Sequence, residues 1–410
     1  MFSAYRAAVD KDAIAFVLAL GRALHRYGTP SHRLEEALQV SCDRLGLRAE
    51  LFTTPTTIII TFGEPADLRT AMMRVGGDQL DMDKLEQVDD LADDVAAGTV
   101  TPGEGVARLA QIEASRTPFS RPLVTACHGV TAGAMAVFFG GSLPDVAVAA
   151  AIGLLLGLLA TFAQRSTDQA RVFELVGAVI AAIIAGVVSS LWHAITPSLV
   201  TIASLIVLLP GMAITTAMIE LATRNLIAGT ARLMSAVIVL LELVVGVALG
   251  EHVAGALVTV HQPIPHALPE WANWLALGAA SVSISVVVRA QTRAFAYIIL
   301  ACTVGYVGTR AGTEWLGHDM ATLGVLVGAI ALGVLCNVFA RLRERPAQVL
   351  LVPAVLLLVP GSMGFRGMTS LLDRDTLTGV ETVFGMFVVA LALGAGLLVA
   401  NAIVSPRRSL

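Results

Sequence analysis

Two carboxylates lie in apolar stretches of this sequence, where they could bind a cation or carry a proton. Glu242 is near the middle of the apolar run 231–250, and Glu220 follows Pro210 by ten residues. A charge at bilayer depth is costly and usually marks the path of an ion or a substrate. We therefore predict that Glu242 or Glu220 is a proton-coupling residue. The alternative for each is a structural ion pair, which Glu220 could form with Arg224 four residues later.

One broken apolar pattern occurs twice, as Leu208 to Met212 and as Leu358 to Ser362, with the two prolines 150 residues apart. Proline removes a helical hydrogen bond, and in lipid the freed carbonyl needs protein or a polar cavity around it. The amides that open the helix after each break could bind a carboxylate, while Glu220 could bind an ammonium group. Simple helix kinks are the alternative. The predicted substrate-binding residues are Pro210, Gly211, Thr215, Glu220, Pro360, Gly361 and Ser362.

The composition is that of a polytopic membrane protein with a soluble N-terminal part. Of the 410 residues, 56% are hydrophobic and 14% are charged. More than half of the charged residues fall in residues 1–121. A net charge of −4 gives no reason to expect a nucleic-acid partner. The four cysteines form no CxxC motif, so we expect no disulfide framework, no metal site and no cofactor.

The first 120 residues are predicted to form a small cytoplasmic α+β domain. Apolar residues at helical spacing indicate helices over 8–27 and from Ser31 onwards, with Ser31 as the helix cap. β-branched residues predict strands within 48–62 and a third strand over 68–75. Further helices are expected at 81–97 and 102–114. The chain opens with an amphipathic segment, so we expect its N-terminus to stay in the cytoplasm.

Ten apolar stretches follow, most of them close to the length that a bilayer requires. If residue 121 is cytoplasmic, thirteen arginines lie on the cytoplasmic side and three on the other, as the positive-inside rule predicts. Both termini are then cytoplasmic. The predicted spans are 123–141, 144–163, 172–192, 197–219, 231–250, 272–289, 294–309, 320–340, 348–368 and 380–403.

A shift of 150 residues aligns the first five stretches with the last five. Because five is odd, the second copy must enter the membrane upside down, which predicts two inverted five-helix repeats. Such folds place the substrate between the halves, beside broken helices. We predict repeats at 121–255 and 271–405, joined by an extracytoplasmic linker at 256–270.

Several other polar groups allow two interpretations. The basic turn with His25 and His32 could bind an anion or lie on the surface. The acidic helix 81–97 could hold a metal, although such charge runs usually form a solvated face. The histidines of 251–270 could sense pH or bind a metal, and a stiff linker is the default. Further polar residues could line a path or hold helices together, namely Thr215, Thr216, Ser281, Ser283, Ser285 and Asn337.

The segments Leu20 to Glu35, Leu209-Pro210-Gly211 with Ile219-Glu220-Leu221 and Gly229 to Leu233, and Val359 to Phe365 resemble the threonine/serine exporter family. The resemblance covers essentially the whole chain. The N-terminal domain with the first five spans is similar to one family module, and the last five spans are similar to the second. Where the family pattern has an Asp after the first Pro-Gly, this chain has Glu220, which keeps the carboxylate.

The resemblance implies a transporter of the bacterial inner membrane, driven by the proton gradient. We expect a secondary exporter of small hydrophilic metabolites, with threonine or serine as the substrate, and not an enzyme. Its partners are then the small molecule, protons and the lipid bilayer, and a homo-oligomer is compatible with the sequence. Dicarboxylate export is the alternative, in which Arg224 or Arg366 would dominate binding. A hydrolase or a ligand sensor in the N-terminal domain is a further alternative.

Overall fold

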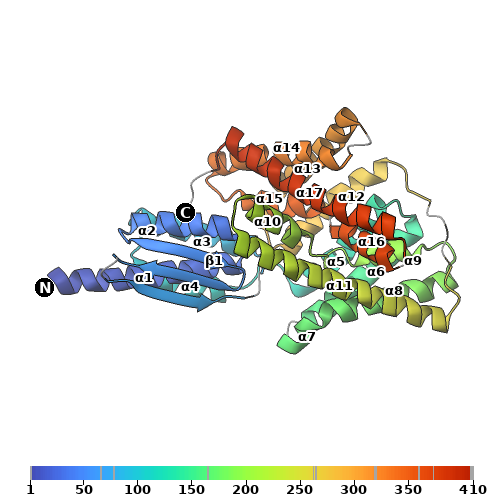
Figure 1. The fold of residues 1–410 in the computed structure, drawn as a ribbon, viewed down its shortest axis with the longest axis horizontal. Helices are drawn as coiled ribbons and strands as arrows, with labels where there is room; N and C mark the ends of the chain where they lie inside the picture. Colours follow the sequence, from blue (N-terminus) through green and yellow to red (C-terminus); the bar gives the residue numbers. More distant parts are fainter. Residues whose placement is uncertain are drawn as a thin grey trace.

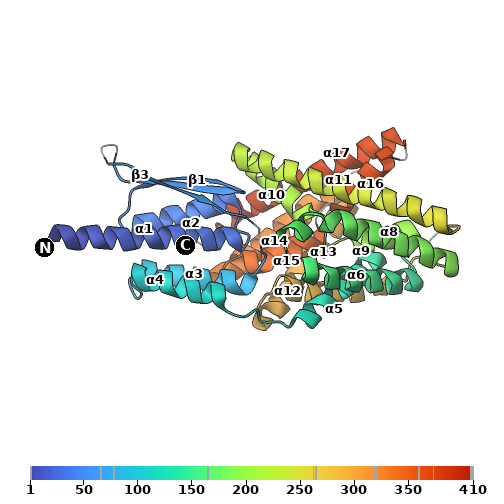
Figure 2. The ribbon, with the colours of Figure 1, turned by 90° about the horizontal axis from the view of Figure 1, so that it is seen from below.

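The computed structural model describes residues 2–64, 67–76, 79–163, 166–261, 263, 266–317, 321–358, 361–372 and 374–406. It is mainly α-helical, with one small sheet near the N-terminus. A domain containing this sheet lies at one end of a larger body of helices (Figures 1 and 2).

The N-terminal domain contains the three predicted strands, which pair in the order β1-β2-β3 as an antiparallel sheet. Ile58 and Ile60 of β2 are buried with Phe16, Leu20 and Leu38 of the helices beneath. Alternation along β2 sends the isoleucines to this core, which is why the β-branched run forms a strand here. The elements are α1 (Phe2–Arg26), α2 (Ser31–Arg44), β1 (Ala49–Thr54), β2 (Thr57–Phe62), β3 (Arg69–Arg74), α3 (Met82–Ala96) and α4 (Pro102–Ala114).

The prediction that Ser31 caps the second helix is wrong by one residue. The cap position is Pro30, which has no side-chain hydrogen bond to offer, and Ser31 is the first residue of α2. The amide at the start of α2 therefore needs a partner from elsewhere.

Thirteen α-helices and one short 3-10 helix follow in the described part of the chain. Among the described residues, seven helical stretches are long and apolar enough to cross a membrane. Of the ten predicted spans, α5, the stretch 197–219 and α12 are not among these seven. The helices are α5 (Arg121–Phe138), α6 (Leu143–Ala163), α7 (Thr167–Arg171), α8 (Phe173–Leu191), α9 (Pro197–Ser204), α10 (Gly211–Ala222), α11 (Leu226–Leu257), α12 (Trp271–Val287), the 3-10 turn Thr292–Ala294, α13 (Phe295–Leu316), α14 (Ala321–Arg343), α15 (Gln348–Leu358), α16 (Gly361–Leu372) and α17 (Thr376–Ile403).

The predicted break at Pro210 is confirmed, because α9 ends at Ser204 and α10 begins at Gly211 with Pro210 as its cap residue. At the second site, α15 ends at Leu358 and α16 begins at Gly361. Pro360 itself lies outside the described residues.

Two pairs of helices on either side of the 256–270 segment begin 150 residues apart. Helices α10 and α16 begin at Gly211 and Gly361, and α11 and α17 begin at Leu226 and Thr376. The residues before these long helices include Arg224 and Arg374, which both adopt left-handed backbone conformations with φ of 66° and 65°. Helix α11 begins beside the N-terminal domain, whereas α17 ends there, so the two long helices run in opposite directions (Figure 1).

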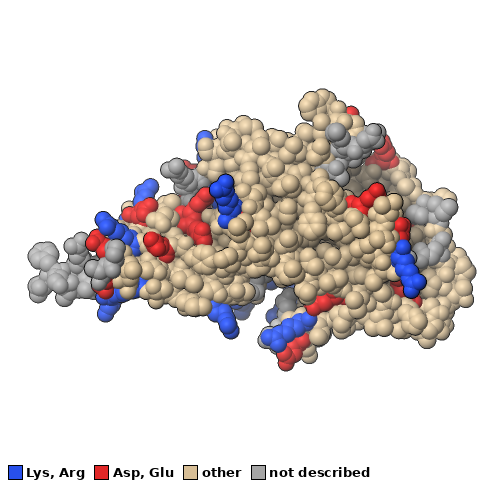
Figure 3. All heavy atoms as spheres, viewed as in Figure 1, with Lys and Arg blue, Asp and Glu red and all other residues tan. Residues whose placement is uncertain are grey.

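Charge is concentrated at the two ends of the molecule, as the visible face in Figure 3 shows. Between them lies a broad uncharged surface over the helices. Large apolar side chains are exposed on these helices, including Leu154, Leu241 and Leu391. An apolar girdle of this kind is expected of a multi-pass membrane protein, whose solvent is lipid.

Candidate functional site

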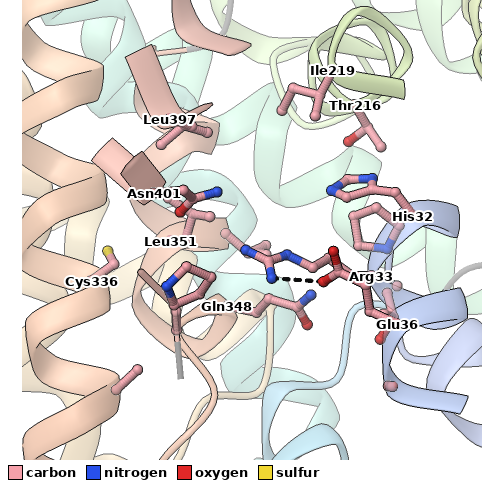
Figure 4. A pocket seen from close by; sticks show the side chains of 18 of the residues that line it. His32, Arg33, Glu36, Thr216, Ile219, Cys336, Gln348, Leu351, Leu397 and Asn401 are labelled. Atoms are coloured by element: carbon pink, nitrogen blue, oxygen red, sulfur yellow. Dashed lines mark hydrogen bonds and ion pairs between the residues drawn. The ribbon is translucent and has the colours of Figure 1, made fainter. Parts of the chain in front are cut away.

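A cavity of about 750 Å³ lies between the N-terminal domain and the helical body. One wall is formed by the α1–α2 turn and α2, and the other by α10, α14, α15 and α17 (Figure 4). Thr215 and Thr216 reach it from α10, the helix that follows the Pro210 break. The cavity therefore lies between the N-terminal domain and the helix that follows the Pro210 break.

Glu220 of α10 lies next to this cavity and is completely buried. Its Oε2 accepts a hydrogen bond from Arg232 Nε at 3.1 Å, and its Oε1 accepts from Arg232 Nη2 at 3.3 Å. Oε1 also accepts the Ser31 backbone N–H at 3.1 Å. The carboxylate thus binds the N-terminal amide of α2, where a negative charge is favourable. Glu220 takes the place of the missing cap side chain and links the domain to the helical body.

The predicted ion pair between Glu220 and Arg224 is wrong. Helix α10 ends at Ala222, and Arg224 has left the helical path in a left-handed conformation with an exposed side chain. The partner is Arg232 of α11, whose side chain is only 13% exposed. Glu220 therefore does form an ion pair, as the alternative to a proton-coupling role predicted, but its partner is Arg232 and not Arg224.

Three buried polar atoms near the cavity have no hydrogen-bond partner among the described residues. They are Thr29 Oγ1, His32 Nδ1 and Thr215 Oγ1, and all three residues line the cavity. Burial lowers the pKa of His32 to about 4, with Arg33 adding to the effect and Glu220 opposing it. His32 is thus neutral at physiological pH, and its ring and the two hydroxyls can hydrogen-bond a guest.

The first residues of α10 and α16 meet inside the molecule. A Cβ added to Gly361 would lie 3.2 Å from the Cα of Gly211 and 3.2 Å from the Cβ of Leu209. Ser362 is partly buried on α16. Of the predicted substrate-binding residues that the structure describes, Thr215 lines the cavity and Glu220 lies beside it, whereas Pro210, Gly211, Gly361 and Ser362 belong to the junction of the breaks.

Glu242 lies in the middle of α11, apart from the cavity-lining residues. It is about 15 Å along the helix from Arg232, given the rise per residue. Its electrostatic neighbour is Glu174 at the start of α8. The structure therefore separates the two predicted proton-coupling residues into different environments.

The acidic helix α3 is not a solvated face, as the sequence suggested, but a docking surface for the loops of the second half. Arg345 Nη1 contacts Glu86 Oε1 at 2.9 Å and Asp90 Oδ2 at 2.7 Å. Arg293 also contacts Glu86, at 3.1 Å. Burial raises the pKa of Glu86, while Arg345 and Arg293 oppose that shift. Within the described part of the chain, no group of three or more potential ligands could hold a metal ion.

Backbone contacts strengthen this attachment. Met82 N donates to Val288 O at 3.0 Å, and Asp83 N donates to Arg289 O at 3.2 Å. Arg289 Nη1 in turn contacts Asp81 Oδ2 at 3.1 Å. From the sequence, the arginines of these loops indicate only the membrane orientation of the helices. The acidic run on 81–97 is the feature that could have indicated their partner.

Of the three serines of α12, Ser283 links two helices by a side-chain hydrogen bond. Ser283 is hydrogen-bonded to Thr131 of α5 at 2.9 Å, while Ser281 and Ser285 donate to carbonyls of their own helix. Asn337 does line the cavity, and it donates to Asn401 Oδ1 and to Val404 O at 2.8 Å each. Arg33 lines the cavity and belongs to the basic turn of His25 and His32, for which the sequence allows anion binding. The cavity residues Glu36, Gln348 and Asn401 were not predicted, because the helices that carry them are far apart in sequence.

Comparison with known proteins bears on this architecture. A family model for threonine/serine exporters matches residues 15–254, and a second, described as "Threonine/Serine exporter, ThrE", matches residues 274–403. The chain belongs to the threonine/serine exporter family. In this exporter family member both modules are present in one polypeptide, and the predicted linker 256–270 lies between the two matched regions.

Curated relatives of this exporter family member come from yeasts. The chain is 28% identical to "Pheromone-regulated membrane protein 10" of Saccharomyces cerevisiae (strain YJM789), over 87% of this chain and 47% of the relative. Proteins of the same name match from Debaryomyces hansenii, at 26% identity over 90% of this chain and 37% of the relative, and from Eremothecium gossypii, at 24% over 95% and 56%. The chain thus spans about half or less of these relatives' length. No solved structure matches it.

Proposed function

We propose that this protein is a secondary active exporter of small hydrophilic metabolites, with threonine or serine as the substrate and the proton gradient as the driving force. The observation that carries the proposal is the cavity of mixed polar and apolar lining, which lies between the N-terminal domain and α10, directly behind the Pro210 break. Binding beside a broken helix between two halves is the common arrangement in secondary transporters. The membership in the exporter family supports the same function.

Alternating access would follow from two inverted five-span repeats. In this proposal α9 with α10, and α15 with α16, each make one broken span, which gives ten spans with both termini in the cytoplasm of a bacterial cell. The 150-residue spacing of helix starts, the opposite directions of α11 and α17, and the contact between Gly211 and Gly361 support it. The cavity then opens towards the cytoplasm.

Glu220 is our candidate for proton coupling. Its negative charge is held by Arg232 and by the Ser31 amide, with the neutral His32 nearby. A proton on Glu220 would remove the charge that both donors require, so proton uptake would loosen the contact between α2 and α10. Glu242 remains the alternative carrier, since Glu174 on the neighbouring helix α8 is close enough for the two like charges to influence each other.

Transport in proteoliposomes or inside-out vesicles tests the function. With an acidic vesicle interior, labelled threonine should accumulate, and dissipating the proton gradient should abolish the accumulation. Glu220→Gln and Glu242→Gln should be compared, because only the coupling residue should lose gradient-driven accumulation while retaining exchange of internal for external threonine. Absence of threonine and serine transport by the wild-type protein would reject the proposal.

A further inference from the structure

The N-terminal domain contributes a pair of opposite charges to the cavity wall. Arg33 Nη1 lies 3.0 Å from Glu36 Oε2, one turn later on α2. Figure 4 shows the Arg33 side chain reaching from α2 into the space that faces Gln348 and Asn401. The pair therefore sits where a guest in the cavity can touch both charges.

This ion pair can open at little cost, so that Arg33 and Glu36 each bind an opposite charge on a ligand instead of each other. The Arg33 and Glu36 side chains are 30% and 66% exposed, so water screens their attraction. Exposed pairs on one helix contribute little to stability, and opening one loses correspondingly little. A zwitterion carries one negative and one positive charge, which can replace Glu36 as the partner of Arg33 and Arg33 as the partner of Glu36.

We propose that the Arg33–Glu36 pair is the receptor for the zwitterionic head of an α-amino acid. The guanidinium binds the carboxylate, for which its planar fork is suited, and Glu36 accepts from the ammonium group. Thr216 and Asn337 line the opposite wall and offer hydrogen-bonding atoms for a side-chain hydroxyl. This assignment rests on the proposed function and makes the N-terminal domain part of the substrate site.

The charge balance of the cavity favours an amino acid over a dicarboxylate. Among the described residues that line it, Arg33 is the one arginine or lysine, beside the carboxylates of Glu35, Glu36 and Asp89. Glu35 is held by Thr53, whose N–H and hydroxyl donate to it at 2.8 Å and 2.9 Å. A second carboxylate on the ligand would meet like charge instead of a partner.

Reconstituted full-length protein tests the assignment through the KM for labelled threonine and its inhibition by succinate. Arg33→Gln and Glu36→Gln should each raise the KM for threonine at least about tenfold, because each variant loses one charged contact with the substrate. Glu36→Gln should also increase inhibition by succinate, because it removes a repelling charge; a purely structural role would not do so. Thermal unfolding should show that both variants remain folded.

Arg48 and Glu64 provide the matched control, since they form an ion pair at 2.9 Å in the same domain and do not line the cavity. Arg48→Gln and Glu64→Gln should leave the KM unchanged. If the wild type carries threonine but the Arg33 and Glu36 variants behave like these controls, the receptor assignment is wrong while the exporter stands. If the wild type carries neither threonine nor serine, the proposed function itself fails.

Discussion

Gly361 packs directly against Gly211, so closely that a Cβ on Gly361 would lie 3.2 Å from the Gly211 Cα. These glycines open the two helices that follow the Pro-Gly motifs, and they are 150 residues apart. Contact at this distance leaves little room for a side chain between the two backbones. The starts of α10 and α16 therefore form one junction within the helical body.

Gly361→Ala should destabilise the protein, because the added methyl group must displace the Gly211 backbone or Leu209. We expect a loss of about 1–3 kcal/mol, as for overpacking in a core, with slower transport. Gly278→Ala in α12 is the control, since its added Cβ meets nothing within 4 Å. Thermal unfolding of both variants in detergent measures the difference, and equal midpoints would show that the junction tolerates a side chain.

Glu220→Gln should weaken the contact between the N-terminal domain and α10. The amide can still accept from the Ser31 N–H, but the charged contact between Glu220 and Arg232 in a mostly buried site is lost. A cost of about 1–3 kcal/mol is expected for the half-satisfied pair. Limited proteolysis of the α1–α2 turn reports the loosening. Glu242→Gln should not change this cleavage, and a similar rate in both variants would contradict the role given to Glu220.

His32 should make stability fall with decreasing pH. Its pKa is about 4 in the folded protein and its ordinary value is 6.5, so below that value the unfolded state binds the proton more readily. The contribution of the neutral ring is present above about pH 6.5 and declines towards pH 4, by up to about 3 kcal/mol. Unfolding midpoints at several pH values should therefore show a shallower decline for His32→Gln than for the wild type. His266→Gln, at an exposed position, should follow the wild type.

Arg345→Gln should loosen the attachment of α3 to the second half, because this arginine contacts Glu86 and Asp90 together. Hydrogen exchange should then rise in the Met82 and Asp83 amides, which bond to the α12–α13 loop. Arg310 is the comparison, since it also bridges two carboxylates, Glu270 and Glu314, at exposed positions. Unchanged exchange in Arg345→Gln would mean that the backbone contacts suffice without the ion pairs.

Local signals in the sequence were enough to predict the strands and the break at Pro210, because β-branched runs and Pro-Gly pairs act within a few residues. The partners of Glu220 were not predictable in the same way. Arg232 follows it by twelve residues across a turn, and Ser31 precedes it by 189 residues. Only tertiary packing brings these groups together, and the same is true of Gln348 and Asn401 in the cavity. The acidic helix and the arginine-containing loops were each recognisable in the sequence, but the ion pairs between them were not predictable.

The N-terminal domain makes more described polar contacts with the second half of the helical body than with the first. Ion pairs and backbone bonds tie α3 to the loops around Arg289 and Arg345, whereas the described polar link to the first half centres on Glu220. If the two halves rock as in the proposed transport cycle, the N-terminal domain would move with the second half. A protein that bound this domain would slow the transport cycle from outside the bilayer, without entering the substrate path.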